Sequence, residues 1–252
     1  MKSFRGLVAK YIEDKRSEGI HMTLIDPEKV NREEAARIAE SAYSAGTDAI
    51  MVGGSTGFTR ERFEEVVLGI KENVEIPIII FPSGSRSLSK YADAIFFMSL
   101  LNSESRQMIV GEQVKAAKII KELGLEPLPM GYVVIEPGMT VGRVGKAMMI
   151  PRTSEGAELL VSYALATEFF GMKYFYVEAG SGAYAPPPPE MIKRVREETS
   201  VVLFTGGGIR TPESAKELRK AGADVIVTGT IVEKEKDVYA TLKKIVDAIK
   251  SQ

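Results

Sequence analysis

Glycine, serine and threonine gather in three short segments that each follow a predicted strand: EAGSGA at 178–183, TGGGIR at 205–210 and TGT at 228–230. Backbone N–H groups in such turns are accessible because Cβ atoms are missing, and they hold a phosphate with little help from side chains. A single glycine-rich turn would also fit a tight connection between a strand and a helix. Three of them in neighbouring positions predict a phosphate-binding site.

Glu178 ends the predicted strand 174–178, directly at the first of these segments. A carboxylate beside a bound phosphate has its pKa raised by like-charge proximity, toward the range of a general base. We therefore predict that Glu178 takes the proton from a hydroxyl of the phosphate-bearing substrate, and that Tyr176, on the same face of the strand, orients this hydroxyl. The alternatives are a salt bridge from Glu178 to Lys or Arg, and a packed core tyrosine.

A metal site is predicted from Asp26 in LIDPEK and Ser55 in VGGS, which stand at the ends of the predicted strands 21–26 and 48–52. Carboxylate and hydroxyl oxygens suit Mg²⁺, which keeps several waters and often bridges to substrate phosphates. The pair predicts a Mg²⁺-diphosphate site, and a helix cap is the alternative for Asp26. Four cations are candidates for the diphosphate or for plain solvation: Lys29, Arg143, Lys146 and Arg152.

The elements that must position these residues are eight short β-branched runs separated by segments of helical period. The predicted strands are 21–26, 48–52, 76–81, 94–99, 127–134, 174–178, 201–205 and 225–228. Strands that alternate with helices indicate an α/β protein with a parallel sheet, and 252 residues suit a (β/α)₈ TIM barrel that forms a single domain over 1–252. AGTDAIMVGGS at 45–55 and AGADVIVTGT at 221–230 repeat one βα pattern.

Two connections depart from a regular barrel. Residues 82–93, PSGSRSLSKYAD, are too short and too rich in Ser and Gly for a crossover helix. An extended segment is therefore predicted to replace the helix after the third strand, giving a modified barrel. Residues 136–153 contain three glycines and only scattered apolar residues, which predicts a mobile active-site loop.

Composition excludes several classes of function. The 33 basic and 34 acidic residues nearly cancel, so no overall field attracts nucleic acid. The chain has no cysteine and a single histidine, His21, which excludes thiolate sites and histidine clusters and leaves His21 a structural role. No apolar run approaches the ~20 residues of a bilayer span, and the charged N-terminus is unlike a signal peptide. We expect a cytoplasmic protein, with peripheral membrane contact left open.

Taken in order, HMTLIDPEK, IMVGGS, IFFMSLLNS, LPMGYVVIEPG, YFYVEAGSGA, TGGGIR and IVTGT resemble the motif series of the geranylgeranylglyceryl phosphate synthases, a family that includes bacterial heptaprenylglyceryl phosphate synthases. The resemblance implies a modified barrel whose third helix is replaced by an extended segment. It also implies a prenyltransferase that joins sn-glycerol 1-phosphate to geranylgeranyl diphosphate through an ether bond and releases diphosphate. This reaction belongs to the phospholipid biosynthesis of archaeal membranes.

The resemblance also implies roles for individual residues. Asp26 and Ser55 are implied to bind Mg²⁺ with the diphosphate, and Glu178 is implied to be the general base. The residues implied to bind the glycerol phosphate are Tyr176, Val177, Glu178, Ala179, Gly180, Ser181, Gly182, Gly206, Gly207, Gly208, Gly229 and Thr230. Members of the family form dimers or hexamers, so a homo-oligomer is expected.

Several points stay open at the level of sequence. A sugar-phosphate isomerase or aldolase shares the three-turn phosphate site, and a prenyl-phosphate carrier without catalysis is a second alternative. The residues that suit either the core or the wall of a prenyl groove are Phe96, Phe97, Met98, Met130 and Tyr132. Twenty carbons is the family's common chain length in archaea and thirty-five the bacterial one. Within the departure LLNSESRQ at 100–107, Glu104–Arg106 are expected to alter the groove entrance or an oligomer contact, and the four prolines at 186–189 have no assigned function.

Overall fold

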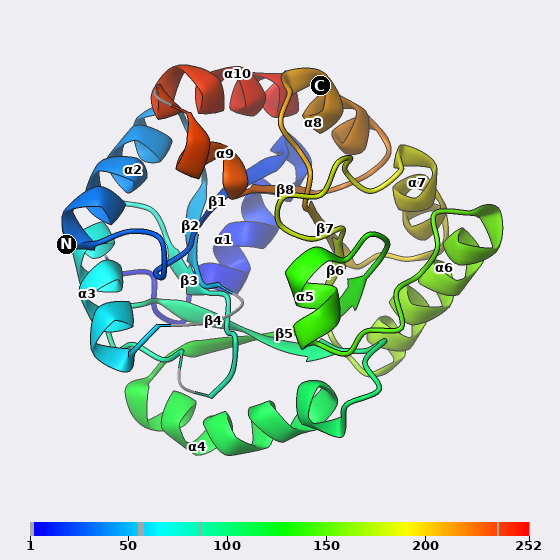
Figure 1. Cartoon of the computed structure of the whole chain (residues 1–252), viewed down its shortest axis with the longest axis horizontal. Helices are drawn as coiled ribbons and strands as arrows, with labels where there is room; N and C mark the ends of the chain where they lie inside the picture. Colours follow the sequence, from blue (N-terminus) through cyan, green and yellow to red (C-terminus); the bar gives the residue numbers. More distant parts are fainter. Residues whose placement is uncertain (1–2, 55–57, 86, 236, 252) are drawn as a thin grey trace.

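The computed structural model describes residues 3–54, 58–85, 87–235 and 237–251 and contains a closed barrel of parallel strands (Figure 1). Each strand pairs with its neighbour in the chain, and β1 and β8 close the circle through the pair Ile20 and Val225. The strands are β1 Ile20–Ile25, β2 Ala49–Val52, β3 Ile78–Ile80, β4 Ala94–Leu100, β5 Glu126–Val134, β6 Tyr174–Glu178, β7 Val202–Gly206 and β8 Val225–Thr228. The predicted (β/α)₈ fold is confirmed.

Helices surround the barrel as an outer ring (Figure 1). They are α2 Arg32–Ser44, α3 Arg60–Lys71, α4 Glu112–Leu123, α6 Ser154–Phe169, α7 Pro189–Glu198, α8 Pro212–Lys220 and α10 Val238–Lys250. Side-chain caps fix where they start, because Asn31 accepts the Glu34 N–H at the start of α2 and Thr211 accepts the Ser214 N–H at the start of α8. Within the described chain, no helix combines the length and apolar character that a bilayer span requires.

Four segments shape the C-terminal end of the barrel. The described residues between β3 and β4 contain no helix, as predicted, and we call residues 82–93 the strap. The predicted loop over 136–153 is wrong in part, because it contains the short helix α5 Met139–Val144, which begins after Gly138 in the left-handed conformation. The helix α9 Thr230–Lys234 follows β8, and a π-helical turn, Gln107–Gly111, precedes α4.

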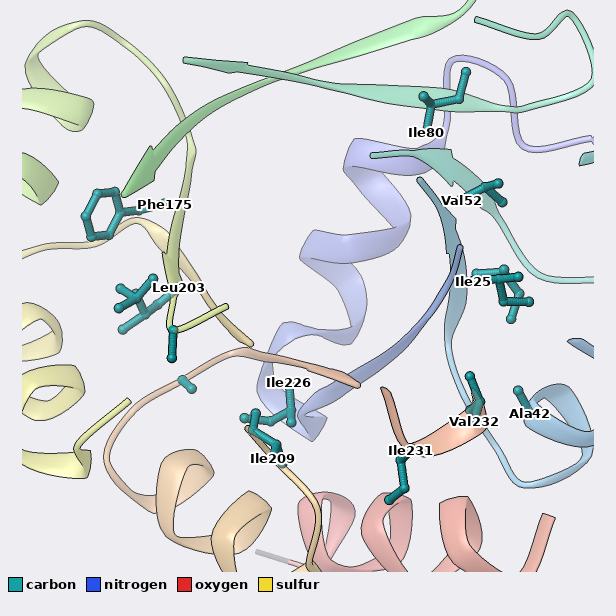
Figure 2. Close-up of a cluster of buried hydrophobic side chains, with 14 of the residues drawn as sticks. Ile25, Ala42, Val52, Ile80, Phe175, Leu203, Ile209, Ile226, Ile231 and Val232 are labelled. Carbon is teal, nitrogen blue, oxygen red and sulfur yellow. The ribbon is translucent and has the colours of Figure 1, made fainter. Parts of the chain in front are cut away.

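Both faces of the strands are buried, as is usual for parallel barrels. Alternate side chains point outward and pack between the strands and the helices, as Figure 2 shows. The outward set includes Ile25, Val52, Ile80, Phe175, Leu203 and Ile226. The remaining side chains point into the barrel and form a second cluster, which includes Met22, Met51, Phe96, Tyr176 and Phe204. This double burial explains why the strands appear in the sequence as continuous apolar runs.

At the N-terminal end of the barrel, three buried aspartates each form an ion pair with a Lys or Arg side chain. Asp48, Asp93 and Asp224 occupy one position of the repeated segments TDAI, ADAI and ADVI. Asp93 accepts from Lys71 Nζ at 2.8 Å and from a backbone N–H of β3 at 3.0 Å. Helix α1 Val8–Lys15 covers this end, and its last residue, Lys15, pairs with Asp48 at 2.8 Å. The aspartate at the start of each repeated strand therefore stabilises the fold.

Candidate active site

The C-terminal ends of β6, β7 and β8 line a small pocket, with about 420 Å³ of space up to and including its opening to solvent, which we call the glycine-rich pocket. Its lining includes Tyr176, Glu178, Ser181, Gly207, Gly208, Ile209, Arg210, Thr228, Gly229 and Thr230. The three segments that the sequence predicts to form one site are thus brought together at one end of the barrel. This is the end at which barrel enzymes place their active sites.

The structure does not place every predicted residue in the lining of this pocket. Val177 and Ala179 face the outer core instead. Gly180 acts through its backbone, because its N–H donates to Glu178 Oε1 at 2.6 Å. The Ser181 hydroxyl does line the pocket and lies 3.0 Å from the Thr230 hydroxyl, which bridges the loops after β6 and β8.

Close approach requires glycine at two places beside the pocket. A Cβ at Gly206 would lie 2.1 Å from the Tyr176 hydroxyl, so any side chain there would displace the tyrosine ring. A Cβ at Gly207, whose φ is +85°, would lie 2.6 Å from Glu178 Oε1. These glycines therefore open the space that the two predicted functional side chains occupy.

Two arginines hold the loop that follows β6. Arg210 Nη2 donates to the Ala183 carbonyl at 2.8 Å, and Arg152 Nη2 donates to the Pro186 carbonyl at 2.6 Å. The Arg152 guanidinium also lies 5.5 Å from the centroid of the Tyr184 ring. The four-proline run is thus anchored at its first residue, and Arg152 is engaged by backbone carbonyls rather than placed in an open diphosphate site.

Glu178 is buried at the inner end of the pocket, with 7% of its surface exposed. Burial raises the pKa of Glu178 to about 7, although the Gly180 N–H and the hydroxyls of Tyr176 and Tyr132 lower it. The physical cause therefore differs from the predicted one, because desolvation acts before any phosphate binds. Among the described residues no Lys or Arg pairs with Glu178, so the structure does not support the salt-bridge alternative.

Two tyrosines lie beside Glu178 on neighbouring strands. Tyr132 of β5 and Tyr176 of β6 are opposite each other in register, and their ring centroids are 5.2 Å apart. Burial raises the pKa of both hydroxyls, so both remain neutral donors. The buried Tyr132 hydroxyl lies near enough to Glu178 to lower the pKa of that carboxyl group, but it makes no hydrogen bond of regular geometry among the described residues. A bound substrate can satisfy such a group, and sequence reasoning had placed Tyr132 only in the core or a groove wall.

A second and larger cavity, which we call the groove, lies between the strap, β4 and α4 and contains about 1280 Å³ of space up to its opening to solvent. Its wall is mostly apolar and includes Phe81, Ile95, Phe96, Phe97, Met98, Leu100, Met108, Ala116, Ile120, Tyr132, Val141 and Val144. Of the five residues that suited either the core or a groove wall, Met130 packs inside the barrel, and the groove is lined by Phe96, Phe97, Met98 and Tyr132. Ile95 and Phe97 belong to the outer face of β4, so the groove passes from the barrel mouth over this strand.

Asp26 lines the groove, and its carboxylate takes part in the loop after β1. Its Oδ1 accepts the Glu28 N–H at 3.0 Å, and its Oδ2 lies 3.7 Å from Lys29 Nζ. The cap of α2 is Asn31, so the interpretation of Asp26 as the cap of that helix is wrong. Ser55, the predicted second metal ligand, lies outside the described residues. Arg143 and Lys146 are both exposed.

The two cavities meet. Leu24, Glu178, Ser181 and Gly229 line both of them. A small molecule in the glycine-rich pocket would therefore lie next to an apolar molecule in the groove, with Glu178 between them. Fold and site together define a barrel enzyme that brings a small phosphate ester and a long apolar molecule to one carboxyl group.

Comparisons with known proteins identify the family within this class. Residues 10–249 match the PcrB family, and the chain belongs to that family. The geranylgeranylglyceryl phosphate synthase of Thermoplasma volcanium is 51% identical over 236 residues, which cover 94% of this chain and 93% of that protein. The protein of the same name from Thermococcus gammatolerans is 50% identical over 241 residues, with 95% of each chain covered.

A solved structure supports the same conclusion. The crystal structure of (S)-3-O-geranylgeranylglyceryl phosphate synthase from Thermoplasma acidophilum, in complex with substrate sn-glycerol-1-phosphate, has a TM-score of 0.94 and 49% identity over 100% of both chains. The predicted membership of the geranylgeranylglyceryl phosphate synthase family is therefore confirmed.

Sequence reasoning missed three residues that the structure places at or between the cavities. Arg210 ends the motif TGGGIR, so its position beside the glycines was a usable signal. Glu112 and Gln113 line the groove from α4, but nothing in their sequence neighbourhood marks them. His21, in contrast, is buried between Thr47 and Thr228 at 2.8 and 2.9 Å, and burial lowers its pKa to about 4, which fits the predicted structural role.

Proposed function

We propose that this chain transfers the geranylgeranyl group from geranylgeranyl diphosphate to a hydroxyl of sn-glycerol 1-phosphate, a step of archaeal-type membrane phospholipid biosynthesis. The observation that carries the proposal is the meeting of the glycine-rich pocket and the groove at Glu178. Relatives at about 50% identity bear the name of this synthase, and one was solved with sn-glycerol-1-phosphate. A sugar-phosphate enzyme would have no use for the apolar groove.

The glycine-rich pocket is suited to the phosphate of sn-glycerol 1-phosphate. Gly207 and Gly208 line it with backbone that no side chain covers, and the paired hydroxyls of Ser181 and Thr230 add donors. Such backbone donors bind phosphate oxygens without a dedicated cation. The glycerol hydroxyls then extend toward Glu178 and the groove.

The groove is suited to the prenyl chain. At ~0.8 kcal/mol per buried CH₂, a twenty-carbon chain contributes on the order of 10 kcal/mol before the loss of its conformational freedom. Binding energy of this size arises far from the reacting carbon, and it fixes the diphosphate end of the chain at the barrel mouth, near Asp26 and Glu178.

In the proposed reaction the C3 hydroxyl oxygen of sn-glycerol 1-phosphate forms a bond to C1 of the prenyl chain. The bond between C1 and the diphosphate oxygen breaks, and the diphosphate leaves with the bonding electron pair. Glu178 takes the hydroxyl proton, which a carboxyl group with a pKa of about 7 can do near neutral pH. Tyr176 and Tyr132, whose ring centroids are 5.2 Å apart, would orient the oxygen and stabilise the positive charge that develops on the allylic carbon.

We propose Mg²⁺ as the cofactor, held by Asp26 and the diphosphate, with Ser55 as the predicted second ligand. The Asp26 side chain is 16% exposed and lines the groove, so its carboxylate is accessible to an ion. No cluster of three acidic or histidine ligands occurs in the described part of the chain, which suits an ion that keeps waters and binds substrate phosphates. When bound, Mg²⁺ would stabilise charge on the leaving diphosphate.

The family resemblance further supports a homo-oligomer, a dimer or a hexamer, that works in the cytoplasm and touches membranes at most peripherally. Light scattering after size-exclusion chromatography measures the oligomeric state directly. A monomer would contradict this part of the proposal.

A product assay tests the reaction. The protein is incubated with Mg²⁺, sn-glycerol 1-phosphate and prenyl diphosphates of ten, fifteen, twenty and thirty-five carbons, beside the variants Asp26→Ala and Glu178→Ala. We expect an ether product that favours twenty carbons and is lost in both variants. If the folded protein binds glycerol phosphate yet forms no ether with any chain, the proposed function is wrong.

A further inference from the structure

The groove exists because the strap replaces a helix, so its width depends on what holds the strap. Residues 82–84 line the groove on one side, and Glu112, Gln113 and Ala116 of α4 line it on the other. A standard barrel helix between β3 and β4 would pack by apolar contacts along its length. The strap makes such contacts through Leu88, Tyr91 and Ala92 in its second half, so its first residues, 82–85, need an anchor of their own to stay at a fixed distance from α4.

Glu112 provides this anchor. Its Oε2 accepts the Ser85 N–H at 2.7 Å, and a Cβ on Gly84 would lie only 3.1 Å from the same oxygen. Its Oε1 accepts from Lys115 Nζ at 3.1 Å and from the Gln107 amide. One carboxylate thus joins the strap, the π-helical turn and α4.

The charge on Glu112 is stabilised although the residue is partly buried. Burial alone would raise its pKa, but the N–H and hydroxyl of Ser85, the Gln107 amide and Lys115 together lower the pKa to about 2. Glu112 is therefore ionised at any working pH, and its bond to the strap is a charge-assisted one, which is stronger than a neutral hydrogen bond. A charged residue in the wall of an apolar groove is unfavourable unless it is held in this way.

The end of α4 that carries Glu112 is itself fixed to the barrel. The Gln113 amide donates to the carbonyls of Met98 in β4 and Met108 in the π-helical turn. The Ser99 hydroxyl of β4 donates to the Ile109 carbonyl at 2.6 Å. A π-helical turn leaves carbonyls out of the regular helix pattern, and here these side chains satisfy them. Glu112 consequently holds the strap against a rigid support.

We propose that Glu112 is a positioning residue that sets the width of the groove and thereby the selectivity among prenyl chains. This inference rests on the proposed function, because it assigns the groove to the prenyl substrate. Without the Glu112 carboxylate, the first residues of the strap move away from α4. The groove then loses contact with a twenty-carbon chain and discriminates less against chains of other lengths.

The experiment compares Glu112→Ala and Glu112→Gln with Glu122→Ala, a matched control. Glu122 lies at the far end of the same helix, 62% exposed and paired only loosely with Lys118 at 3.9 Å. For each variant, KM and kcat are measured with prenyl diphosphates of ten, fifteen, twenty and thirty-five carbons and saturating sn-glycerol 1-phosphate. Hydrogen exchange of the segment 82–85 is measured in parallel, without substrate.

For Glu112→Ala we expect about a tenfold higher KM for the twenty-carbon substrate, which corresponds to ~1.4 kcal/mol. The ratio of kcat/KM between twenty and thirty-five carbons should fall several-fold, while kcat and the KM for sn-glycerol 1-phosphate change less than twofold. Exchange in 82–85 should become faster by a similar factor. Glu112→Gln, which keeps an acceptor oxygen without the charge, should restore part of each effect, and Glu122→Ala should match the parent.

A parent-like chain-length profile in Glu112→Ala, or an equal rise of both KM values, would overturn the inference, because a merely structural residue would affect both substrates alike. Failure of the proposed function looks different. In that case the unmodified protein forms no ether product with any chain, whereas faster exchange in 82–85 on loss of Glu112 still tests the anchor itself. Unchanged exchange rejects the anchor whatever the substrate is.

Discussion

Replacing Glu178 by glutamine is expected to remove most of the activity and, at the same time, to stabilise the protein at neutral pH. The amide keeps the shape of the side chain and an oxygen that can accept the Gly180 N–H, which now lies 2.6 Å from Oε1. The variant lacks a group that can take the proton of the glycerol hydroxyl. Loss of a general base lowers kcat by about 10²–10⁴-fold.

The gain in stability follows from the burial of the carboxyl group. Its pKa rises from 4.5 to about 7 on folding, so the folded protein binds this proton more tightly than the unfolded chain does. Below pH 4.5 both states are protonated, and the stability contributed by the bound proton is complete. That stability is lost as the pH rises toward about 7, because the unfolded chain ionises first. Above this pH the loss is on the order of 3 kcal/mol.

Thermal unfolding at two pH values tests this reasoning. At pH 8, Glu178→Gln should melt about 6–12 °C above the parent, because 1 kcal/mol shifts the melting temperature of a chain of this size by roughly 2–4 °C. At pH 5 the difference should be much smaller. Glu122→Gln, an exposed carboxyl on α4, serves as the control and should melt like the parent at both values. A destabilised Glu178→Gln variant at pH 8, or one that keeps full activity, would refute the assignment.

Four further outcomes are expected. In the parent, kcat/KM for sn-glycerol 1-phosphate should rise with pH up to about 7 and then level off as Glu178 ionises, and a flat profile from pH 5.5 to 8 would argue against this base. Gly206→Ala should lower activity more than tenfold with an unchanged circular dichroism spectrum, because its Cβ would lie 2.1 Å from the Tyr176 hydroxyl. Lys71→Met leaves Asp93 buried without its cation and should lower the free energy of unfolding in urea by about 3–5 kcal/mol; a change below 1 kcal/mol would mean that the carboxylate finds another partner. Chelation with EDTA should stop product formation, and Mg²⁺ should restore it, whereas activity that persists without metal would rule out the proposed cofactor.

The barrel and the glycine-rich pocket were predictable from sequence because their causes are local. Strands such as 225–228 are buried on both faces, so each appears as a short apolar run. The turns after β6 and β7 need backbone without Cβ, so Gly180 and Gly207 mark them in the sequence itself. Asp26 and Glu178 could be singled out as candidates because each stands at or just after the end of a strand, and the fold fixes where strand ends meet.

What could not be predicted depends on contacts between distant segments. The raised pKa of Glu178 comes from burial, which a single sequence does not show, and the sequence suggested a neighbouring phosphate instead. The Tyr132 hydroxyl comes close to Tyr176 and Glu178 only because β5 and β6 pair in the observed register. Glu112 meets Ser85 only because the strap takes a path that no periodicity encodes.

The repeated βα unit explains how a site that lowers stability can be tolerated. In the unit at 221–230, Asp224 at the start of β8 accepts from Arg196 at 2.6 Å and from the Leu203 N–H at 2.8 Å, which ties β8 to β7. Gly229, which follows the other end of the same strand, has no side chain to pack in the core and lines both cavities. Stabilising contacts therefore gather at the N-terminal end of the barrel, where nothing has to bind, and the buried Glu178 sits at the opposite end. Changes at Asp224 should consequently lower the free energy of unfolding and leave KM for both substrates unaltered. Changes at Gly229 should alter KM and leave the free energy of unfolding nearly unaltered.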